Sequence, residues 1–299
     1  MIISVASGKG GTGKTTVATS LALALDDVQF LDCDVEEPNA GVFLASWLTG
    51  REDAVLLMPQ VDETACNWCG RCQEVCAFNA LAVIPPVDGG SGKVLRFDSL
   101  CHGCGACSRL CPRNAITDVP EKIGRVDWGI AHQDGGPDLD FVQGTLDIGQ
   151  SLSPPVIQAV KRHLNQQKTV IIDAPPGTSC PVIEAIDGSD YCILVTEPTP
   201  FGLHDLALAV ELLGKMEIPF GVVINRSNDR NQAVERFCAE RNIPILFRIP
   251  YKREIAEAYS RGIPLVELSP EYRGKFRAVF ESLCRTPGEA AQVRTEGES

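Results

Sequence analysis

The chain has no hydrophobic run long enough to span a membrane, and its longest apolar stretches have the length of strands. Basic residues are fewer than acidic ones: 27 Lys and Arg residues stand against 39 Asp and Glu residues, which gives a formal net charge of −12. An acidic surface repels phosphate backbones and anionic lipids, so we expect no nucleic-acid partner and no binding to a membrane surface. A basic amino-terminal segment and a cleavage site are also missing, which argues against secretion.

Cysteine, by contrast, is abundant, and eight of the 13 cysteines form two runs with the spacing C-x2-C-x2-C-x3-C. The runs are Cys66, Cys69, Cys72 and Cys76, then Cys101, Cys104, Cys107 and Cys111. Disulfides would need an oxidising compartment, and zinc sites usually show two separated C-x2-C pairs. Three closely spaced thiols with a fourth further on are typical of iron–sulfur ligation. The runs therefore predict two [4Fe–4S] clusters in a reducing cytoplasm.

The segment that carries these runs resembles a bacterial-type two-cluster ferredoxin. In that family the fourth cysteine of each run binds the other cluster. The resemblance implies one cluster on Cys66, Cys69, Cys72 and Cys111 and another on Cys76, Cys101, Cys104 and Cys107. Between the runs, apolar residues on either side of the Gly-rich segment 88–92 predict a hairpin over residues 80–97. Ala77 stands where the family usually has proline, which leaves the ligands intact.

A phosphate-binding motif opens the chain. An apolar strand is expected over residues 1–6, a G-x4-G-K-T sequence follows, and residues 17–25 are expected to be helical, which is the context that a P-loop requires. The loop N–H groups would surround the phosphates, Lys14 would reach the β- and γ-phosphates, and Thr15 would bind Mg2+. The expected nucleotide-binding residues are Gly8, Lys9, Gly10, Gly11, Thr12, Gly13, Lys14, Thr15 and Thr16.

A second lysine, Lys9, lies within the loop, so that K-G-G-T-G-K-T resembles the deviant Walker A motif of the MinD/ParA/Mrp ATPases, a class that includes the nitrogenase iron protein. This resemblance implies ATP, Mg2+ and a nucleotide-dependent dimer, either of two identical chains or with a related ATPase. It also implies that Lys9 reaches the nucleotide of the other subunit, in the manner of an arginine finger. The alternative is a solvated lysine at the tip of a loop.

Two further stretches resemble the switch segments of this class. Residues 30–34 end an expected strand, and the resemblance to switch I implies that Asp34 orients or activates the attacking water. An apolar strand over 169–172 leads to Asp173, and the resemblance to Walker B and switch II implies that Asp173 holds the Mg2+ shell. Either aspartate alone would more often be a strand-end cap, but both follow strands of a sheet that carries a P-loop.

The remaining sequence alternates strands and helices, which predicts an α/β fold with a mostly parallel P-loop NTPase sheet, helices on both faces and a small inserted α+β ferredoxin-like domain. Expected strands cover 191–196, 220–225, 245–249 and 265–268, and expected helices cover 155–164, 202–215, 232–241, 253–261 and 271–283. Asn225 and Pro250, with Tyr251, resemble the adenine-reading segment of the class. The plainer alternative for Asn225 is a turn former.

The cysteine segment interrupts the ATPase between the two switches. We expect an ATPase domain over 1–61 and 120–287, an inserted domain over 62–119 and a disordered tail over 288–299. Gly- and Asp-rich residues 120–151 are expected to return through short strands. The helix over 271–283 has apolar residues at helical spacing, which favours packing on the sheet over a membrane-targeting face of the MinD kind.

The motifs favour an ATP-hydrolysing protein in which the nucleotide gates electron transfer through the two clusters to a redox partner. The first alternative is a carrier or scaffold for iron–sulfur or metal-cofactor assembly, as in Mrp proteins, although their carboxy-terminal C-x2-C pair is absent here. The second alternative is a spatial organiser of the MinD or ParA kind, which the acidic charge disfavours. Cys180 lies about where the nitrogenase iron protein has a cluster ligand, but a buried cysteine is the commoner case.

Overall fold

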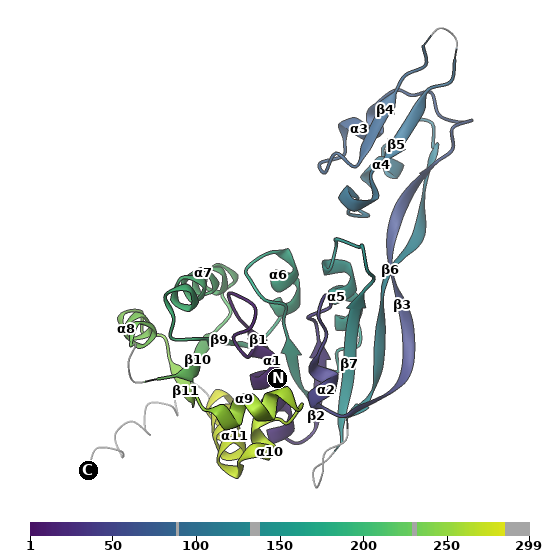
Figure 1. Ribbon diagram of the computed structural model, residues 1–299. Coiled ribbons are helices and arrows are strands. Elements are labelled where there is room, and N and C mark those ends of the chain that lie inside the picture. Colours follow the sequence, from purple (N-terminus) through teal and green to yellow (C-terminus); the bar gives the residue numbers. More distant parts are fainter. Residues whose placement is uncertain (88–89, 132–137, 229–231, 285–299) are drawn as a thin grey trace. The chain divides into compact units, whose positions relative to one another are not determined.

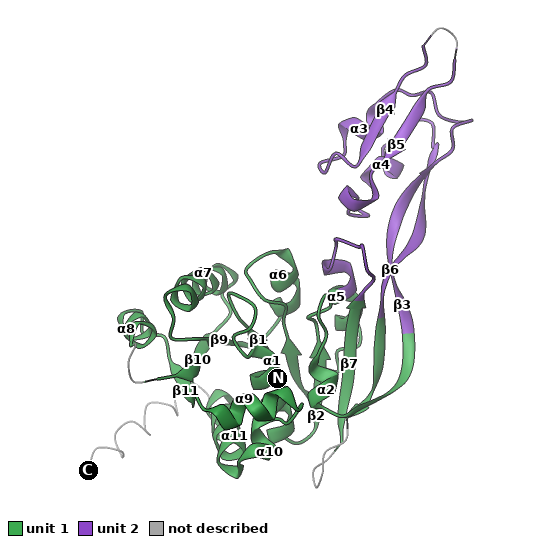
Figure 2. Cartoon of the chain, in the orientation of Figure 1, with its two compact units in different colours: residues 1–51, 126–145, 157–299 green, residues 52–125, 146–156 purple. Residues whose placement is uncertain are grey.

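The computed structural model describes residues 1–87, 90–131, 138–228 and 232–284. Two compact units divide the chain (Figure 2). The first unit comprises residues 1–51, 126–145 and those from 157 onward, and the second comprises 52–125 and 146–156. The segment 62–119, expected as an insertion, lies inside the second unit. The expected tail at 288–299 and residues 88–89 of the expected hairpin lie outside the described residues.

A nine-stranded sheet runs in the order β11-β10-β9-β1-β8-β2-β7-β6-β3 (Figure 1). Its strands are β1 (Ile2–Ala6), β2 (Val28–Asp32), β3 (Ser46–Val61), β6 (Ile116–Ala131), β7 (Leu139–Leu146), β8 (Thr169–Asp173), β9 (Tyr191–Thr196), β10 (Phe220–Ser227) and β11 (Ile245–Pro250). From β11 to β7 every neighbouring pair is parallel. The innermost strands are apolar and buried on both faces, as parallel strands covered by helices must be. The predicted α/β fold with a mostly parallel sheet is confirmed.

Helices lie on both sides of this sheet (Figure 1). They are α1 (Lys14–Ala24), α2 (Ala40–Phe43), α5 (Pro154–Lys161), α6 (Cys180–Ile186), α7 (Pro200–Met216), α8 (Ala233–Glu240), α9 (Arg253–Ser260), α10 (Leu265–Leu268) and α11 (Pro270–Cys284). Phe276 of α11 is fully buried in the main core, where it meets Phe247 edge-on, so the expectation that this helix packs on the sheet is confirmed. Among the described residues, no helix has the length and hydropathy needed to cross a membrane.

Two sequence predictions for this region are wrong. Residues 265–268 were expected as a strand but form α10, where Leu265 N donates to Ser20 Oγ at 3.2 Å and its side chain is buried. A segment of four residues, three of them apolar, is too short to show a helical or strand period, so only its contacts could identify it. The short strands expected over 120–151 are also wrong in part, because β6 is 16 residues long and pairs with the equally long β3.

Glycines explain why β3 and β6 were hard to foresee. A Cβ on Gly129 would lie 2.0 Å from the carbonyl oxygen of Trp47, and a Cβ on Gly50 would lie 2.3 Å from the Trp128 indole. These glycines permit close approach of two strands and of a tryptophan ring, whereas glycine in sequence usually signals a turn. The glycines of β3 and β6 therefore lie within regular strands, because Trp47 and Trp128 pack where their side chains would be.

The second unit contains two similar halves around the two-stranded sheet of β4 (Leu81–Ile84) and β5 (Lys93–Arg96), which are antiparallel as the hairpin prediction requires. The other elements of this unit are α3 (Arg71–Glu74), η1 (Asp98–Leu100) and α4 (Ala106–Arg109). Gly70 precedes α3 and Gly105 precedes α4, both with positive φ, and Asn79 and Asn114 have positive φ after the fourth cysteine of each run. The two cysteine runs thus fold in the same local way.

Candidate functional site

The loop between β1 and α1 is shaped by a close approach of Asn225. Gly13 has φ of 89°, and a Cβ there would lie 2.2 Å from Asn225 Nδ2. That amide donates to the Thr12 carbonyl at 2.7 Å, which fixes the loop against the end of β10. The first turn of α1 has no side-chain cap and no acidic residue. Its free N–H groups and positive dipole end are therefore available to an anion.

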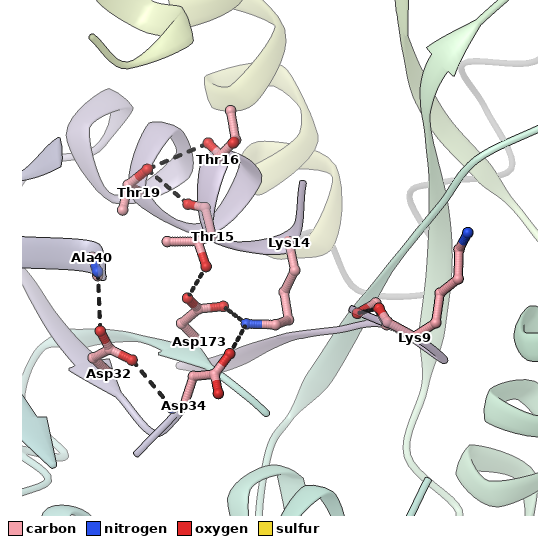
Figure 3. Close-up of polar contacts among 10 residues, drawn as sticks. Lys9, Lys14, Thr15, Thr16, Thr19, Asp32, Asp34, Ala40 and Asp173 are labelled. Carbon is pink, nitrogen blue, oxygen red and sulfur yellow. Dashed lines mark hydrogen bonds and ion pairs between the residues drawn. The ribbon is translucent and has the colours of Figure 1, made fainter. Parts of the chain in front are cut away.

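The ends of β2 and β8 and the start of α1 bring the polar residues predicted from sequence together at this loop (Figure 3). Lys14 Nζ lies 2.7 Å from Asp173 Oδ1 and 3.3 Å from Asp34 Oδ2. The Thr15 hydroxyl donates to Asp173 Oδ2 at 2.6 Å. The ends of β1, β2 and β8 are neighbours in the sheet, so residues far apart in sequence meet at one edge.

Burial and neighbouring charges govern protonation in this group. Burial alone would lower the pKa of Lys14, but Asp173 and Asp34 outweigh it, so the net direction is upward and the ammonium is retained. Burial raises the pKa of Asp34, opposed by Lys14 and reinforced by Asp173. A buried cation held among carboxylates beside an open cavity is poised to exchange these partners for phosphate oxygens.

Asp32 is a site residue that the sequence reasoning missed. Its side chain is fully buried, and its two oxygens accept from the backbone N–H groups of Asp34 and Ala40, both at 3.1 Å. Burial, followed by repulsion from Asp173, raises the pKa of Asp32 well above its ordinary value. Asp32 thus shapes the segment that presents Asp34, and the D-x-D pattern after a strand was the available signal.

A cavity of about 640 Å3 opens at this loop and is the natural place for phosphates. Its lining residues are Ser7, Gly10, Gly11, Gly13, Lys14, Thr15, Thr16, Asp34, Glu36, Glu37, Asn39, Pro175, Pro176, Ser179, Pro181 and Tyr259. Gly8 does not line this cavity but packs against the backbone of Asp205, because a Cβ at Gly8 would lie 2.2 Å from the Asp205 carbonyl oxygen. Most of the predicted phosphate-binding residues line this cavity. Gly8, Lys9 and Thr12 are not among the described residues that line it.

A second cavity of about 300 Å3 adjoins the first and shares Gly11, Gly13, Thr16 and Tyr259 with it. Its other walls include Asn225, Pro250 and Tyr251, the residues that resemble the adenine-reading segment. Apolar walls beside a polar phosphate cavity match the two ends of a nucleotide. The two cavities together therefore offer a continuous site for a base, a ribose and phosphates.

The second unit sorts its eight clustered thiols into two small cavities. One is lined by Cys66, Cys69, Cys72 and Cys111, and the other by Cys76, Cys101, Cys104 and Cys107. Each cavity therefore takes three thiols from one run and the fourth from the other, which is the grouping that the ferredoxin resemblance implies. All eight cysteines are free of disulfides.

The backbone around these thiols suits thiolates that bind a cluster. The N–H groups of Trp68, Ala80 and Ala115 donate to the sulfurs of Cys66, Cys76 and Cys111 at 3.4, 3.2 and 3.3 Å. Hydrogen bonds to cluster sulfurs are one of the means by which proteins set the potential of such a centre. Among the described side chains, no three His, Cys, Asp or Glu converge tightly enough for a single metal ion. Four thiols lining one small cavity are the donors that a four-iron cluster takes, one thiolate for each iron.

Cys180 departs from the expectation of a buried cysteine, because it is exposed at the start of α6. Cys33, Cys192 and Cys238 are buried, and Cys284 is exposed. Burial raises the pKa of Cys192 to about 12, so this thiol stays protonated and packs as a small apolar group.

Comparison with known proteins agrees with the geometry of the nucleotide site. The family model described as the CobQ/CobB/MinD/ParA nucleotide binding domain matches residues 3–265. Among solved structures, the septum site-determining protein MinD complexed with Mg-ADP from Pyrococcus horikoshii has a TM-score of 0.58 at 20% identity, covering 95% of this chain and 96% of that one. At this identity the likeness concerns the fold.

Relatives in sequence extend over most of the chain. An uncharacterized protein of Methanocaldococcus jannaschii is 29% identical over 88% of this chain and 90% of the relative. A protein of Pyrococcus abyssi named as an iron-sulfur cluster carrier is 24% identical over 88% of this chain and 78% of the relative.

Proposed function

This chain belongs to the CobQ/CobB/MinD/ParA family of nucleotide-binding proteins, and we propose that it hydrolyses ATP to gate electron transfer through two [4Fe–4S] clusters. The observation that carries the proposal is the sorting of eight thiols into two cavities of four, each drawing on both cysteine runs, in a chain that also has a P-loop site. One polypeptide then combines one-electron chemistry with phosphate chemistry.

In the ATPase site, the chain's own residues divide the work. Lys14 exchanges its ion pairs with Asp173 and Asp34 for the β- and γ-phosphates. Thr15 and Asp173 would hold Mg2+, which would neutralise phosphate charge when bound. Once Lys14 has turned to the phosphates, the Asp34 carboxylate loses its cation and is free to accept a hydrogen bond from the attacking water. Asn225 and Pro250 line the cavity that receives the adenine.

The cysteine module would hold two clusters by crossed ligation. Cys111 completes the set of Cys66, Cys69 and Cys72, and Cys76 completes the set of Cys101, Cys104 and Cys107. The clusters supply reversible one-electron transfer when bound. Because each cluster ties one run to the other, the folding of this module depends on the metal.

Coupling between the two chemistries follows from where the module is inserted. The chain leaves the ATPase after Asp34, passes through all eight cysteines and returns before Asp173. Switch segments of this kind rearrange with the state of the nucleotide. We therefore propose that ATP closes a dimer of two such chains, or of one chain and a related ATPase, with Lys9 reaching the partner's phosphates, and that closure alters electron delivery to a redox partner.

The test measures both directions of coupling on anaerobically purified protein. ATPase rates are compared with clusters oxidised, reduced and removed, and cluster potentials are titrated by EPR with and without ATP. The proposal expects rates that differ between the three cluster states and potentials that shift with ATP. Equal rates in all three states, together with equal potentials and equal transfer rates to an acceptor, would refute it.

A carrier for iron–sulfur clusters is the second candidate, favoured by relatives such as the Pyrococcus abyssi protein, which is named as an iron-sulfur cluster carrier. Crossed ligation argues for retention, because both runs must release their thiolates before either cluster can leave. The deciding assay follows cluster transfer to an apo-ferredoxin during ATP turnover. Transfer faster than spontaneous loss from the protein favours the carrier, and clusters that stay bound favour electron transfer.

A further inference from the structure

Lys9 lies in the loop between β1 and α1 but does not line the cavity that Lys14 faces. Its ammonium forms an ion pair of 3.0 Å with Glu197 Oε1. Figure 3 shows the Lys9 side chain extending away from Lys14, Asp34 and Asp173. Two lysines of one loop thus have separate partners, and only Lys14 faces the loop's own phosphate cavity.

Glu197 is held in place by the turn between β9 and α7. Thr199 N donates to the Glu197 carbonyl at 2.8 Å, and Thr199 Oγ1 caps α7 by accepting from Gly202 N at 2.9 Å. A Cβ on Gly202 would lie 2.4 Å from the Glu197 carbonyl oxygen, so the turn and the helix fit closely. The Glu197 side chain is only 11% exposed, which keeps its carboxylate in one place.

Glu197 also has a second cation. Arg226 Nη1 donates to Glu197 Oε2 at 3.0 Å, so the two carboxylate oxygens bind different cations. Burial would raise the pKa of Glu197, but Lys9 and Arg226 outweigh it and the pKa is lowered. If Lys9 leaves, Arg226 still compensates the charge of Glu197, so Lys9 departs without leaving a buried carboxylate unpaired.

Arg226 links this ion-pair group to the base end of the nucleotide site. Arg226 is one of the residues that line the 300 Å3 cavity, and its backbone N–H donates to Asn225 Oδ1 at 2.8 Å. Asn225, which is proposed to contact an adenine, is therefore linked through Arg226 to Glu197, which binds Lys9. A bound base that moves Arg226 would weaken one of the two ion pairs of Glu197, the carboxylate that Lys9 also binds.

We propose that Glu197 is a positioning residue that restrains Lys9 within its own subunit until the phosphates of a second subunit compete for it. The inference rests on the proposed role of Lys9 across the dimer interface. A nucleoside triphosphate offers several negatively charged oxygens to the Lys9 ammonium, whereas Glu197 offers one carboxylate that also binds Arg226. The restraint sets a threshold, so that dimers form with ATP and not by chance encounter of empty subunits.

The first experiment measures the restraint itself in the nucleotide-free protein. Acetylation of Lys9 by acetic anhydride is followed by peptide mass spectrometry in wild type, Glu197→Gln and the control Glu211→Gln, which removes an exposed charge from α7 that pairs with Lys215. Loss of one partly exposed ion pair predicts acetylation of Lys9 about two- to fivefold faster in Glu197→Gln and unchanged in the control. Equal Lys9 labelling in all three proteins overturns the restraint.

The second experiment measures dimerisation by light scattering against protein concentration, with a non-hydrolysable ATP analogue at saturation. Glu197→Gln is expected to dimerise at about three- to tenfold lower concentration than wild type, because no ion pair has to be given up. Dimerisation at equal or higher concentration overturns the proposal. Faster labelling of Lys9 with no dimer in any of the three proteins upholds the restraint and refutes the proposed role of Lys9 between subunits.

Discussion

The Thr15 hydroxyl donates a hydrogen bond of 2.6 Å to Asp173, although 158 residues separate the two in sequence. This contact joins the start of α1 to the end of β8, and Lys14 reinforces it with an ion pair to the other oxygen of Asp173. The residues proposed to hold Mg2+ are therefore already side by side without it. A site arranged in advance loses little conformational entropy when the metal and nucleotide bind.

Replacing Asp173 by Asn tests this arrangement. Asn keeps an oxygen that can accept from Thr15 but removes the charge that attracts Lys14 and Mg2+, so phosphate release should fall by about 100-fold or more, and the Mg2+ concentration for half activity should rise. Phosphate release is measured across a Mg2+ titration. Glu240→Gln, an exposed charge change on α8, serves as the control and should keep the wild-type curve. A D173N enzyme with normal Mg2+ dependence would exclude Asp173 from the metal site.

Asp34→Asn tests the residue proposed to orient the attacking water. Nucleotide binding should persist, because Lys14 and the loop N–H groups are intact, while hydrolysis should fall by about 100-fold. Burial raises the pKa of Asp34, and Asp34 must be ionised to accept a proton, so wild-type activity should decline as pH falls, at a higher pH than for an ordinary aspartate. The acid limb of the pH–rate profile should be missing in the variant, and an unchanged limb would assign it to another group.

Asp32 is expected to matter for stability rather than for chemistry. An Asn in its place can accept from one N–H, but its amide group would face the other donor, so Asp32→Asn should lower the free energy of unfolding by about 1–3 kcal/mol. Because the folded pKa of Asp32 is raised, its contribution is largest at low pH and declines as pH rises from the unfolded value toward the folded one. Urea denaturation of the nucleotide-free protein at several pH values should show that the difference in free energy of unfolding between Asp32→Asn and wild type becomes smaller as pH rises. A gap that widens would contradict the assignment.

The strands and the P-loop could be predicted from sequence because their signals are local. Residues 191–196 are apolar over the length of a strand, and β9 has those bounds. For Asp32 the sequence offered only a D-x-D pattern, and for Glu197 it offered no local pattern, because their contacts with Ala40 and Lys9 exist only in the folded chain. Trp128 packs where a side chain at position 50 would lie. This contact accounts for a glycine within β3, but it can be recognised only once the fold is known.

Crossed ligation makes a prediction that an uncrossed arrangement does not. In Cys76→Ser, the cluster that loses a ligand is the one on Cys101, Cys104 and Cys107, because Cys76 lines their cavity and not that of its own run. Iodoacetamide applied anaerobically should therefore alkylate these three thiols of the second run in the variant, while Cys66 and its neighbours stay protected by the other cluster. Peptide mass spectrometry gives the labelling pattern directly. Cys284→Ser, which removes an exposed cysteine outside both runs, should leave all eight thiols protected. Labelling of Cys66, Cys69 and Cys72 in Cys76→Ser would instead mean that each run binds its own cluster.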